Sequence, residues 1–374
     1  MKKILLVFGT RPEAIKLAPL VKFLKNTKEY EVETCSTGQH REMLQQVIDF
    51  FGLKLDYSID VMKPNQTLTD LTSSVLIQVK DILDKSQPDL VIVQGDTTTA
   101  FASALAAFYS KIPVAHVEAG LRTNNLYSPW PEELNRQLIS RIAQIHFAPT
   151  QTAKANLIKE GVDSRKVIVT GNTVIDALFD AYDLIDANVD LTAKLQKKFP
   201  FLNTEKKVIL VTGHRRENFG KGFEEICKAI KEISQRSDAL LVYPVHLNPN
   251  VQGPVRDHLS NSENIILISP LDYPSFLYLM RSAYLILTDS GGVQEEAPSI
   301  GKPVIVMRDT TERPEAVLAG TVLLSGADAS KIKTDVNMLL DDSTKYKSMS
   351  KAINPYGDGK ACLRIFDSLK KFFG

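Results

Sequence analysis

Four polar clusters of the sequence directly follow short, β-branched apolar runs. They are FGTRPEAIK at residues 8–16, QGDTTT at 94–99, HVEAGLR at 116–122 and TDSGGVQEE at 288–296. Carboxylates, cations and paired glycines at strand ends are the residue types needed for acid–base chemistry on an anionic ligand. We therefore interpret the four clusters as candidate parts of an active site.

The first cluster combines the start of a helix with positive charge. Thr10 and Glu13 form a Thr-x-x-Glu capping box, which predicts a helix directly after the first strand. A helix N-terminus attracts anions, and Arg11 and Lys16 add two cations beside it. The alternative is that both cations are solvated residues of the first turns.

The second and third clusters each end an apolar run with an acid, Asp96 and Glu118. Two acids at successive strand ends would point into one crevice, as expected of catalytic groups. The alternative is that either acid caps the next helix. Glu132 and Glu133 follow the turn SPWP and also have two interpretations, because first-turn glutamates commonly serve the helix dipole.

The fourth cluster is the strongest local signal. Gly291 and Gly292 let the backbone approach a ligand, and Ser290 with the following amides can bind phosphate oxygens. A helix N-terminus contributes only about 0.3 to 2 kcal/mol toward an anion, so a diphosphate also needs explicit cations. Arg313 is the candidate cation in the second half of the chain.

Two histidines also follow predicted strands in the second half, His214 in GHRREN and His246 in YPVHLNP. His214 ends the first strand of that half and would therefore point into the same crevice as the fourth cluster. Each histidine is either a catalytic or binding group or a structural histidine whose hydrogen bonds are satisfied.

The elements that must position these residues are parallel β-α units, because short β-branched runs alternate with amphipathic stretches in both halves. Runs such as LVIVQ, apolar almost throughout, predict strands covered on both faces. The predicted strands are 3–8, 31–36, 90–94, 114–117, 146–148 and 167–170, and then 208–212, 240–245, 265–268, 284–288, 304–307 and 322–324. The charged segment 188–207 is a candidate hinge, and the tail after Asn354 predicts a turn and a terminal helix.

Two such series predict an α/β protein with two doubly wound sheets around a central cleft, and ligands at the carboxyl ends of the strands. The length of 374 residues also fits two domains. Lysine and arginine total 45 against 44 acids, so the net charge of +1 gives no general attraction to nucleic acid or an anionic membrane.

Several classes of protein are disfavoured by what the sequence lacks. It has no apolar run of membrane-helix length, and its N-terminal run is too short for a signal peptide, so we expect a cytoplasmic protein. Three scattered cysteines, Cys35, Cys227 and Cys362, suit reduced structural thiols rather than disulfides or zinc. No dinucleotide fingerprint, Walker A string, Cys-x-x-Cys or His-Glu-x-x-His is present, so we expect neither a metal nor a cofactor.

Taken together, ten strings closely resemble the non-hydrolysing UDP-N-acetylglucosamine 2-epimerases. They are FGTRPEAIK, QHREML, GDTTT, HVEAGLRT, SPWPEELNR, GHRREN, YPVHLNP, LTDSGGVQEEAP, RDTTERPEA and NPYGDG, and they run in order from residue 8 to 359. The resemblance implies the GT-B fold, with two Rossmann-like domains and a terminal helix that returns to the first. The implied domains are residues 1–172 with about 356–374, and the UDP-binding residues 173–355.

The resemblance also implies an activity and site residues. The family interconverts UDP-N-acetylglucosamine (UDP-GlcNAc) and UDP-N-acetylmannosamine (UDP-ManNAc), usually as a homodimer, to supply surface polysaccharide precursors. The positions matched to catalysis are Asp96, Glu118, Glu132 and His214. Those matched to the diphosphate or its surroundings are Arg11, Lys16, Ser290, Gly291, Gly292 and Arg313, with Glu296 at the ribose and Phe276 near the uracil.

Many members of the family also bind an activating UDP-GlcNAc beside the catalytic site. The matching positions in this chain are Gln39, Glu42, Arg216 and His246. The chain departs from some members at Asn65, where they carry a basic residue, and at Glu42, where they carry a glutamine. The resemblance therefore specifies the catalytic site more fully than the activating one.

The chemistry follows from the substrate. Carbon 2 is not next to a carbonyl, so the route without nicotinamide is elimination of UDP from carbon 1 and its re-addition to a glycal. Asp96 is the preferred base, and Glu118 or Glu132 its partner. Three rival readings are a GT-B glycosyltransferase, which needs an acceptor, a non-catalytic UDP-sugar sensor, and an epimerase for a modified sugar such as a diacetamido uronate.

Overall fold

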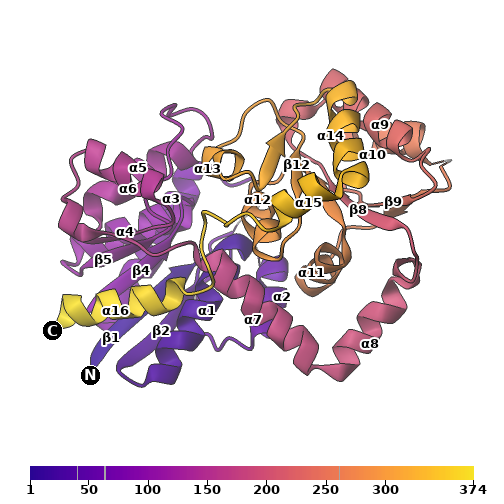
Figure 1. The fold of residues 1–374 in the computed structure, drawn as a ribbon. Coiled ribbons are helices and arrows are strands. Elements are labelled where there is room, and N and C mark those ends of the chain that lie inside the picture. The colour runs from indigo at the N-terminus through magenta and orange to yellow at the C-terminus, as the bar shows by residue number, and fades with distance from the viewer. Residues whose placement is uncertain (40, 63–64, 261) are drawn as a thin grey trace. The chain divides into compact units, whose positions relative to one another are not determined.

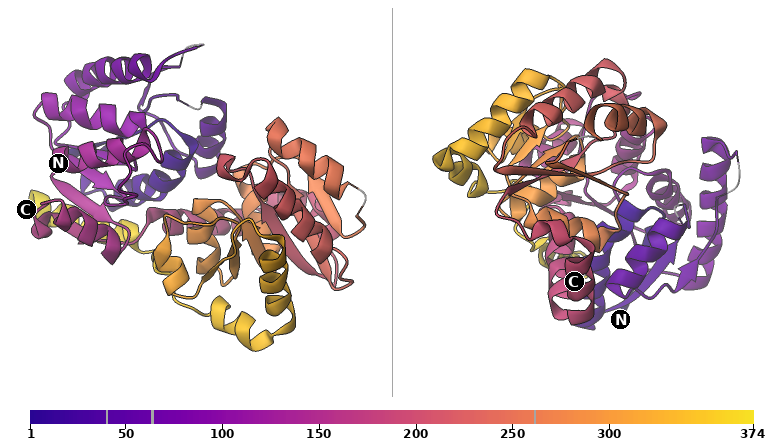
Figure 2. Two further views of the ribbon diagram at one scale, coloured as in Figure 1. Left: turned by 90° about the horizontal axis from the view of Figure 1, so that it is seen from above. Right: turned by 90° about the vertical axis from the view of Figure 1, so that its right-hand side faces the viewer.

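The computed structural model describes residues 1–39, 41–62, 65–260 and 262–374, without the side chains of residues 41–43 and 216. The chain divides into two compact units, residues 1–181 with 356–374 and residues 182–355. Each unit contains one parallel sheet with helices packed against both of its faces (Figure 1, Figure 2). The predicted α/β class is therefore confirmed.

The first unit is built on a sheet of seven strands in the order β3-β2-β1-β4-β5-β6-β7, and all pairs are parallel. The strands are β1 (Lys2–Phe8), β2 (Tyr30–Ser36), β3 (Tyr57–Ser58), β4 (Leu90–Gln94), β5 (Val114–Val117), β6 (Ile145–Ala148) and β7 (Val167–Val169). The order reverses between β1 and β4. This reversal is the switch point at which doubly wound sheets bind ligands.

Helices connect and cover these strands. They are α1 (Arg11–Thr27), α2 (Arg41–Phe51), α3 (Leu68–Ser86), α4 (Thr98–Tyr109), α5 (Glu132–Ile142), α6 (Gln151–Lys159), the 3-10 turn η1 (Ser164–Lys166), α7 (Thr173–Ala187) and α16 (Ala361–Phe373). On one face, Val75 and Val79 of α3 pack in one apolar cluster with Val7 and Val91 of the sheet. Burial of each such side chain stabilises the fold by about 1.5 to 3 kcal/mol.

The second unit has six parallel strands in the order β10-β9-β8-β11-β12-β13, which reverses between β8 and β11. The strands are β8 (Lys207–Thr212), β9 (Ala239–Pro244), β10 (Ile265–Ile268), β11 (Leu285–Thr288), β12 (Val304–Val306) and β13 (Val322–Leu324). The helices are α8 (Val189–Lys198), η2 (Pro200–Leu202), η3 (Arg216–Asn218), α9 (Lys221–Ile233), α10 (Pro249–Leu259), α11 (Tyr273–Ser282), α12 (Gly291–Ser299), α13 (Pro314–Leu318), α14 (Ala329–Asp341) and α15 (Ser343–Ser350).

The C-terminal helix α16 belongs to the first unit, beside α1 and the start of β2 (Figure 1). The ring of Phe366 lies edge-on to that of Phe23, with centroids 5.7 Å apart. Asp176 of α7 accepts hydrogen bonds from the backbone N–H groups of Ala361 and Cys362, at 3.2 and 2.9 Å. These contacts cap the first turn of α16, which has no side-chain cap of its own.

The strands predicted from sequence are confirmed to within one or two residues at their ends. The two-residue strand β3 was missed, as was α8, which lies within the candidate hinge 188–207. All three cysteines are free and buried, as expected. In the described parts of the chain, the helices are too short or too polar to span a membrane.

Candidate active site

Several predicted site residues follow the strands on either side of the two switch points. In the first unit, Arg11 begins the helix after β1 and Asp96 follows the adjacent β4. In the second unit, His214 follows β8 and Ser290 follows the adjacent β11. Each unit thus carries one group of candidate residues at the carboxyl edge of its sheet, the usual ligand position of this fold.

Asp96 has one carboxylate oxygen committed to a neighbour and one that is not. Oδ2 accepts a hydrogen bond from Nη2 of Arg136, whose Nη1 lies 3.2 Å from the buried carboxylate of Glu133. Oδ1 has no hydrogen-bond partner among the described residues. The Asp96 side chain is 27% exposed. A carboxylate with one accessible oxygen is suited to accept a proton from a ligand.

The alternative that Asp96 caps the next helix is wrong, because Thr97 is the N-cap residue of α4. Its hydroxyl oxygen accepts from the backbone N–H of Ala100 at 3.0 Å. The backbone at Asp96 is held instead by Asn135, which donates to the Asp96 carbonyl oxygen at 2.9 Å. The Asp96 side chain therefore does not cap a helix.

A buried histidine fixes the residue before Asp96. Nε2 of His116 donates to the carbonyl oxygen of Gly95 at 2.7 Å. Burial lowers the pKa of His116 to about 3, so the ring is neutral at pH 7, and because a carbonyl only accepts, its single proton lies on Nε2. The chain at Gly95 has φ of +70°, which favours glycine.

Glu118 follows β5 but no helix begins there, so the capping alternative is wrong for this residue too. Oε2 lies 2.5 Å from Nζ of Lys16 and also accepts from the side-chain amide of Gln94. Oε1 accepts from the amide of Asn172 at 3.2 Å. The carboxylate is therefore buried, charge-paired and bonded through both oxygens.

The backbone of Glu118 is in a conformation that residues other than glycine rarely adopt, with φ of +64°. Such a conformation costs on the order of 1 to 3 kcal/mol and is typical of residues in functional sites. Lys16, placed by the resemblance at the diphosphate or its surroundings, lies on this carboxylate. The two residues are 102 positions apart in sequence and meet because α1 and the end of β5 share one sheet edge.

The Thr-x-x-Glu capping box predicted at the start of α1 is confirmed. Glu13 is buried, and its carboxylate accepts from the backbone N–H groups of Gly9 and Thr10 and from the hydroxyl of Thr97. Burial raises the pKa of Glu13, while these donors lower it. Glu13 thus links the start of α1, which carries Arg11, to the loop that carries Asp96.

The two glutamates at the start of α5 have different surroundings. Glu133 is fully buried and accepts from the backbone N–H groups of Thr123 and Asn124, at 3.0 and 3.1 Å. This is the structural interpretation, since Glu133 holds the preceding loop in place. Glu132 is the first residue of α5 and is partly exposed, so it is accessible to a ligand.

In the second unit, Arg313 lies against the start of α12. Its Nε donates to Oε1 of the buried Glu295 at 2.5 Å. A Cβ atom on Gly291 would overlap the guanidinium of Arg313, so any side chain at this position would displace Arg313. The first amides of α12, after Ser290, and a fixed guanidinium together form a site that suits phosphate oxygens.

His214 lies at the other side of this switch point and is partly exposed. Its ring stacks on that of His246, with centroids 5.1 Å apart and planes inclined by 12°. The buried carboxylate of Asp289 accepts from the backbone N–H of His214 at 2.8 Å. The ring is thus accessible, not a structural histidine enclosed in the core.

The remaining predicted residues are placed as follows. Phe276 lies on α11 and is half-buried, and Glu296 lies on α12 and is buried. Gln39 accepts from the hydroxyl of Thr99 at 3.1 Å. The side chains of Glu42 and Arg216 lie outside those that the structure describes.

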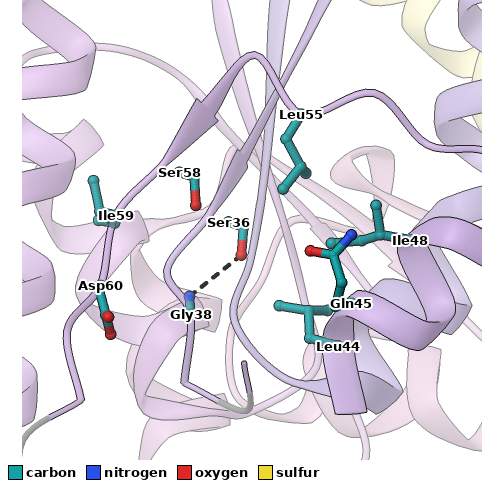
Figure 3. Close-up of a pocket in the computed structure, with 9 residues that line it drawn as sticks. All are labelled: Ser36, Gly38, Leu44, Gln45, Ile48, Leu55, Ser58, Ile59 and Asp60. Atoms are coloured by element: carbon teal, nitrogen blue, oxygen red, sulfur yellow. Dashed lines mark hydrogen bonds between the residues drawn. The ribbon is translucent and has the colours of Figure 1, made fainter. Parts of the chain in front are cut away.

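A small pocket of about 300 Å³ lies beside Gly38, between α2 and the ends of β2 and β3 (Figure 3). It is lined by Ser36, Gly38, Leu44, Gln45, Ile48, Leu55, Ser58, Ile59 and Asp60. Asp60 contributes a carboxylate, and these lining residues include no cation. The pocket by itself does not suit a diphosphate.

Sequence reasoning missed the partners that hold the candidate residues, namely Arg136, Gln94, Asn172, Asp289 and Glu295. Only one carried a local signal, the Glu133-x-x-Arg136 spacing, which places both side chains on one face of α5. Within the described residues, no group of three or more histidine, cysteine, aspartate or glutamate side chains is arranged to hold a metal ion.

Two doubly wound sheets, the second with a helix N-terminus that suits phosphate, define a protein of the GT-B class. A family model described as UDP-N-acetylglucosamine 2-epimerase matches residues 22–370. The UDP-N-acetylglucosamine 2-epimerases of Yersinia pestis and Escherichia coli K12 are 57% and 56% identical over 369 residues, which cover 98% of each chain. The chain belongs to the UDP-N-acetylglucosamine 2-epimerase family.

Solved structures agree with this assignment. The crystal structure of UDP-GlcNAc 2-epimerase from Neisseria meningitidis, bound to UDP-GlcNAc, has a TM-score of 0.92 against this chain at 50% identity. The match covers 99% of this chain and 100% of that chain. The GT-B fold expected from the sequence is confirmed.

Proposed function

We propose that this chain interconverts UDP-GlcNAc and UDP-ManNAc by eliminating UDP and adding it back. The family and the identity to epimerases over the whole chain support the reaction. The structural observation that carries it is the contrast between Asp96, with an accessible oxygen, and Glu118, fixed through both oxygens, at adjacent strand ends. Proton transfer at carbon 2 needs such a base.

In the elimination, the C2–H proton passes to a base and its electron pair forms the C1–C2 double bond. The C1–O bond breaks, and the electron pair of that bond leaves with UDP. Negative charge therefore grows on the diphosphate, where Arg313, Arg11 and the amides of Ser290, Gly291 and Gly292 would stabilise it. In the return step, carbon 2 of the glycal is protonated from the other face and UDP re-forms the bond to carbon 1.

Asp96 is the proposed base, since Arg136 holds one of its carboxylate oxygens and the other remains accessible. Glu118, held by Lys16, Gln94 and Asn172, is less able to move a proton and more suited to orient the sugar. Glu132 is then the proposed partner acid on the other face, because it is partly exposed.

His214 is proposed to donate to the departing phosphate. Glu296 is proposed to hold the ribose hydroxyls, and Phe276 to lie against the uracil. Lys16 would act through Glu118, beside the diphosphate rather than on it.

The test is NMR of the purified chain with UDP-GlcNAc alone in deuterated water. We expect UDP-ManNAc to form and carbon 2 of the recovered nucleotide sugars to carry deuterium. A glycosyltransferase would leave UDP-GlcNAc largely unchanged without an acceptor, and a sensor would bind it without turnover. Absence of both the manno isomer and the label would refute the proposal.

We further propose that Gln39, Glu42, Arg216 and His246 bind a second, activating UDP-GlcNAc, and that the chain acts as a homodimer. The expected setting is the cytoplasm, where surface polysaccharide precursors are made and where three free thiols would stay reduced. A rate that rises more steeply than hyperbolically with UDP-GlcNAc would support the second site. Light scattering gives the oligomeric state.

A further inference from the structure

His214 and Asp289 lie side by side because they follow neighbouring strands of the second sheet. β8 and β11 pair with Thr212 opposite Thr288, so the two residues begin adjoining loops. Oδ2 of Asp289 accepts from the backbone N–H groups of His214 and Arg215, each at 2.8 Å. Its other oxygen, Oδ1, lies 3.7 Å from Nδ1 of His214.

Asp289 carries a buried charge that these two hydrogen bonds satisfy only on one side. The side chain has no exposed surface, and Oδ1 has no hydrogen-bond partner among the residues that the structure describes. An ionised carboxylate in such a place is costly unless a donor or a cation faces it. Nδ1 of His214 is the group placed to supply a proton to that oxygen, after a small rotation of the ring.

The ring of His214 is held from its other side by His246. The two rings stack, and Nδ1 of His246 accepts from the backbone N–H of Asn248 at 3.1 Å, which fixes the supporting ring. With Nδ1 of His214 on the Asp289 side, Nε2 remains for another partner. The side chain is 44% exposed, so a ligand can reach it.

We propose that Asp289 is a positioning residue, which holds the protonated His214 ring by Nδ1–H so that Nε2–H donates to an oxygen of the departing diphosphate. The inference rests on the proposed function, in which His214 faces that leaving group. A neutral ring with its proton on Nδ1 would present a lone pair to the phosphate and repel it. Ser290, the next residue after Asp289, begins the proposed diphosphate site. The same turn therefore positions the His214 ring and binds the diphosphate.

The charges around His214 make the ring responsive to an anion. Burial lowers the pKa of His214, the charge of Asp289 raises it, and His246 and Arg215 lower it. Among the described side chains, these three are the ionisable groups that act on the ring, and the net shift of the pKa is downward. His214 is therefore largely neutral at pH 7.5 in the free chain. A diphosphate beside it favours the protonated form, so binding of UDP takes up a proton.

The first experiment needs no substitution at Asp289. The ring nitrogens of His214 are followed by ¹H–¹⁵N NMR with and without UDP, and are identified among the six histidines by the signal lost in His214→Gln. We expect Nδ1 to be protonated in the UDP complex and the pKa of His214 to rise when UDP binds. A ring that stays neutral, with its proton on Nε2, in the UDP complex overturns the proposal.

The second experiment uses Asp289→Asn, which keeps an oxygen for the two backbone N–H groups but removes the charge. We expect the pKa of His214 in the UDP complex to fall by about one unit, and kcat near pH 7.5 to fall about tenfold or more. Asp257→Asn, on the exposed face of α10, is the matched control and should change neither. An unaltered pKa of His214 in folded Asp289→Asn overturns the proposal.

A double variant separates positioning from loop support. If Asp289 acts through His214, then Asp289→Asn with His214→Gln loses no more than about threefold in kcat beyond His214→Gln alone. If instead the loss in kcat of the double variant equals the product of the losses in the two single variants, then Asp289 only supports the loop and the proposal is overturned. The NMR measurement needs UDP but no turnover. If Asp289 controls His214 but no epimerisation occurs, only the proposed function is refuted. If epimerisation occurs but Asp289 does not control His214, only this inference is refuted.

Discussion

Nζ of Lys16 lies 2.5 Å from Oε2 of Glu118, in a pair whose side chains are 16% and 4% exposed. Loss of one partner from a buried ion pair typically costs about 3 to 5 kcal/mol. We therefore expect Lys16→Met to lower kcat strongly and the unfolding temperature by several degrees, while the Kd for UDP changes less than about threefold.

Lys22→Met is the matched control, because Lys22 lies on the same helix and makes only a long surface contact with Asp180, at 3.8 Å. It should resemble wild type in kcat and in thermal unfolding. Isothermal titration with UDP distinguishes the roles. If Lys16→Met instead weakens UDP binding tenfold or more with unchanged kcat, then Lys16 serves the diphosphate.

Asp96→Asn removes the proposed base and keeps the shape of the side chain. General acid–base groups contribute about 10² to 10⁴-fold, so kcat and the rate of deuterium uptake at carbon 2 should fall on that scale together. UDP affinity should persist, because Asp96 is proposed to act at carbon 2 of the sugar and not on the diphosphate. Asp84→Asn, at an exposed ion pair on α3, is the control. Turnover near the wild-type rate would remove Asp96 from the mechanism.

Gly291→Ala tests the approach of Arg313 to the start of α12. The added methyl group would overlap the guanidinium, so Arg313 must move and UDP should bind about tenfold more weakly, with little change in secondary structure. Gly222→Ala in α9 is the control, since its methyl group meets only ordinary contacts, at 3.4 Å from Cβ of Ala327. Equal UDP affinities in the two variants would contradict the proposed site.

The stability of the first unit should depend on pH through a buried histidine. Burial lowers the pKa of His146 to about 4, below the value of about 6.5 in the unfolded chain. The unfolded state therefore binds a proton that the folded state does not. Stability from this residue is complete above pH 6.5, and on the order of 3 kcal/mol of it is lost as pH falls to 4.

The measurement is the unfolding temperature between pH 7.5 and 4.5. His146→Gln should show a smaller fall than wild type, whereas His258→Gln, at an exposed position on α10, should follow wild type. If the unfolding temperatures of wild type and both variants fall in parallel with pH, then the pKa of His146 does not differ between the folded and unfolded states.

The strands could be predicted because they are short runs buried on both faces, as in Leu90–Gln94. The exceptions have local reasons. β3 has two residues, too few for any pattern, and α8 has only a narrow apolar side with Leu195 as its buried residue. Periodicity is weakest in short elements and in exposed helices.

The sequence predicted individual residues of the candidate site but not which of them contact one another. Gly291 is recognisable as a close-approach glycine, but its neighbour Arg313 is 22 positions away. The pairs of Lys16 with Glu118 and of Arg136 with Asp96 depend on which strands are adjacent, and β1 is adjacent to β4, not to the strand that follows β2. Strand order is a property of the whole sheet, so no local pattern reports it.

The return of α16 to the first unit has a consequence for synthesis of the chain. Asp176 and Phe23 contact residues of α16, which is translated after residues 182–355, and residues 182–355 form an uninterrupted unit. Domains generally fold as units while the chain emerges. The second unit is thus expected to fold first, and the first unit to keep an exposed apolar surface that chaperones can bind until α16 has been made.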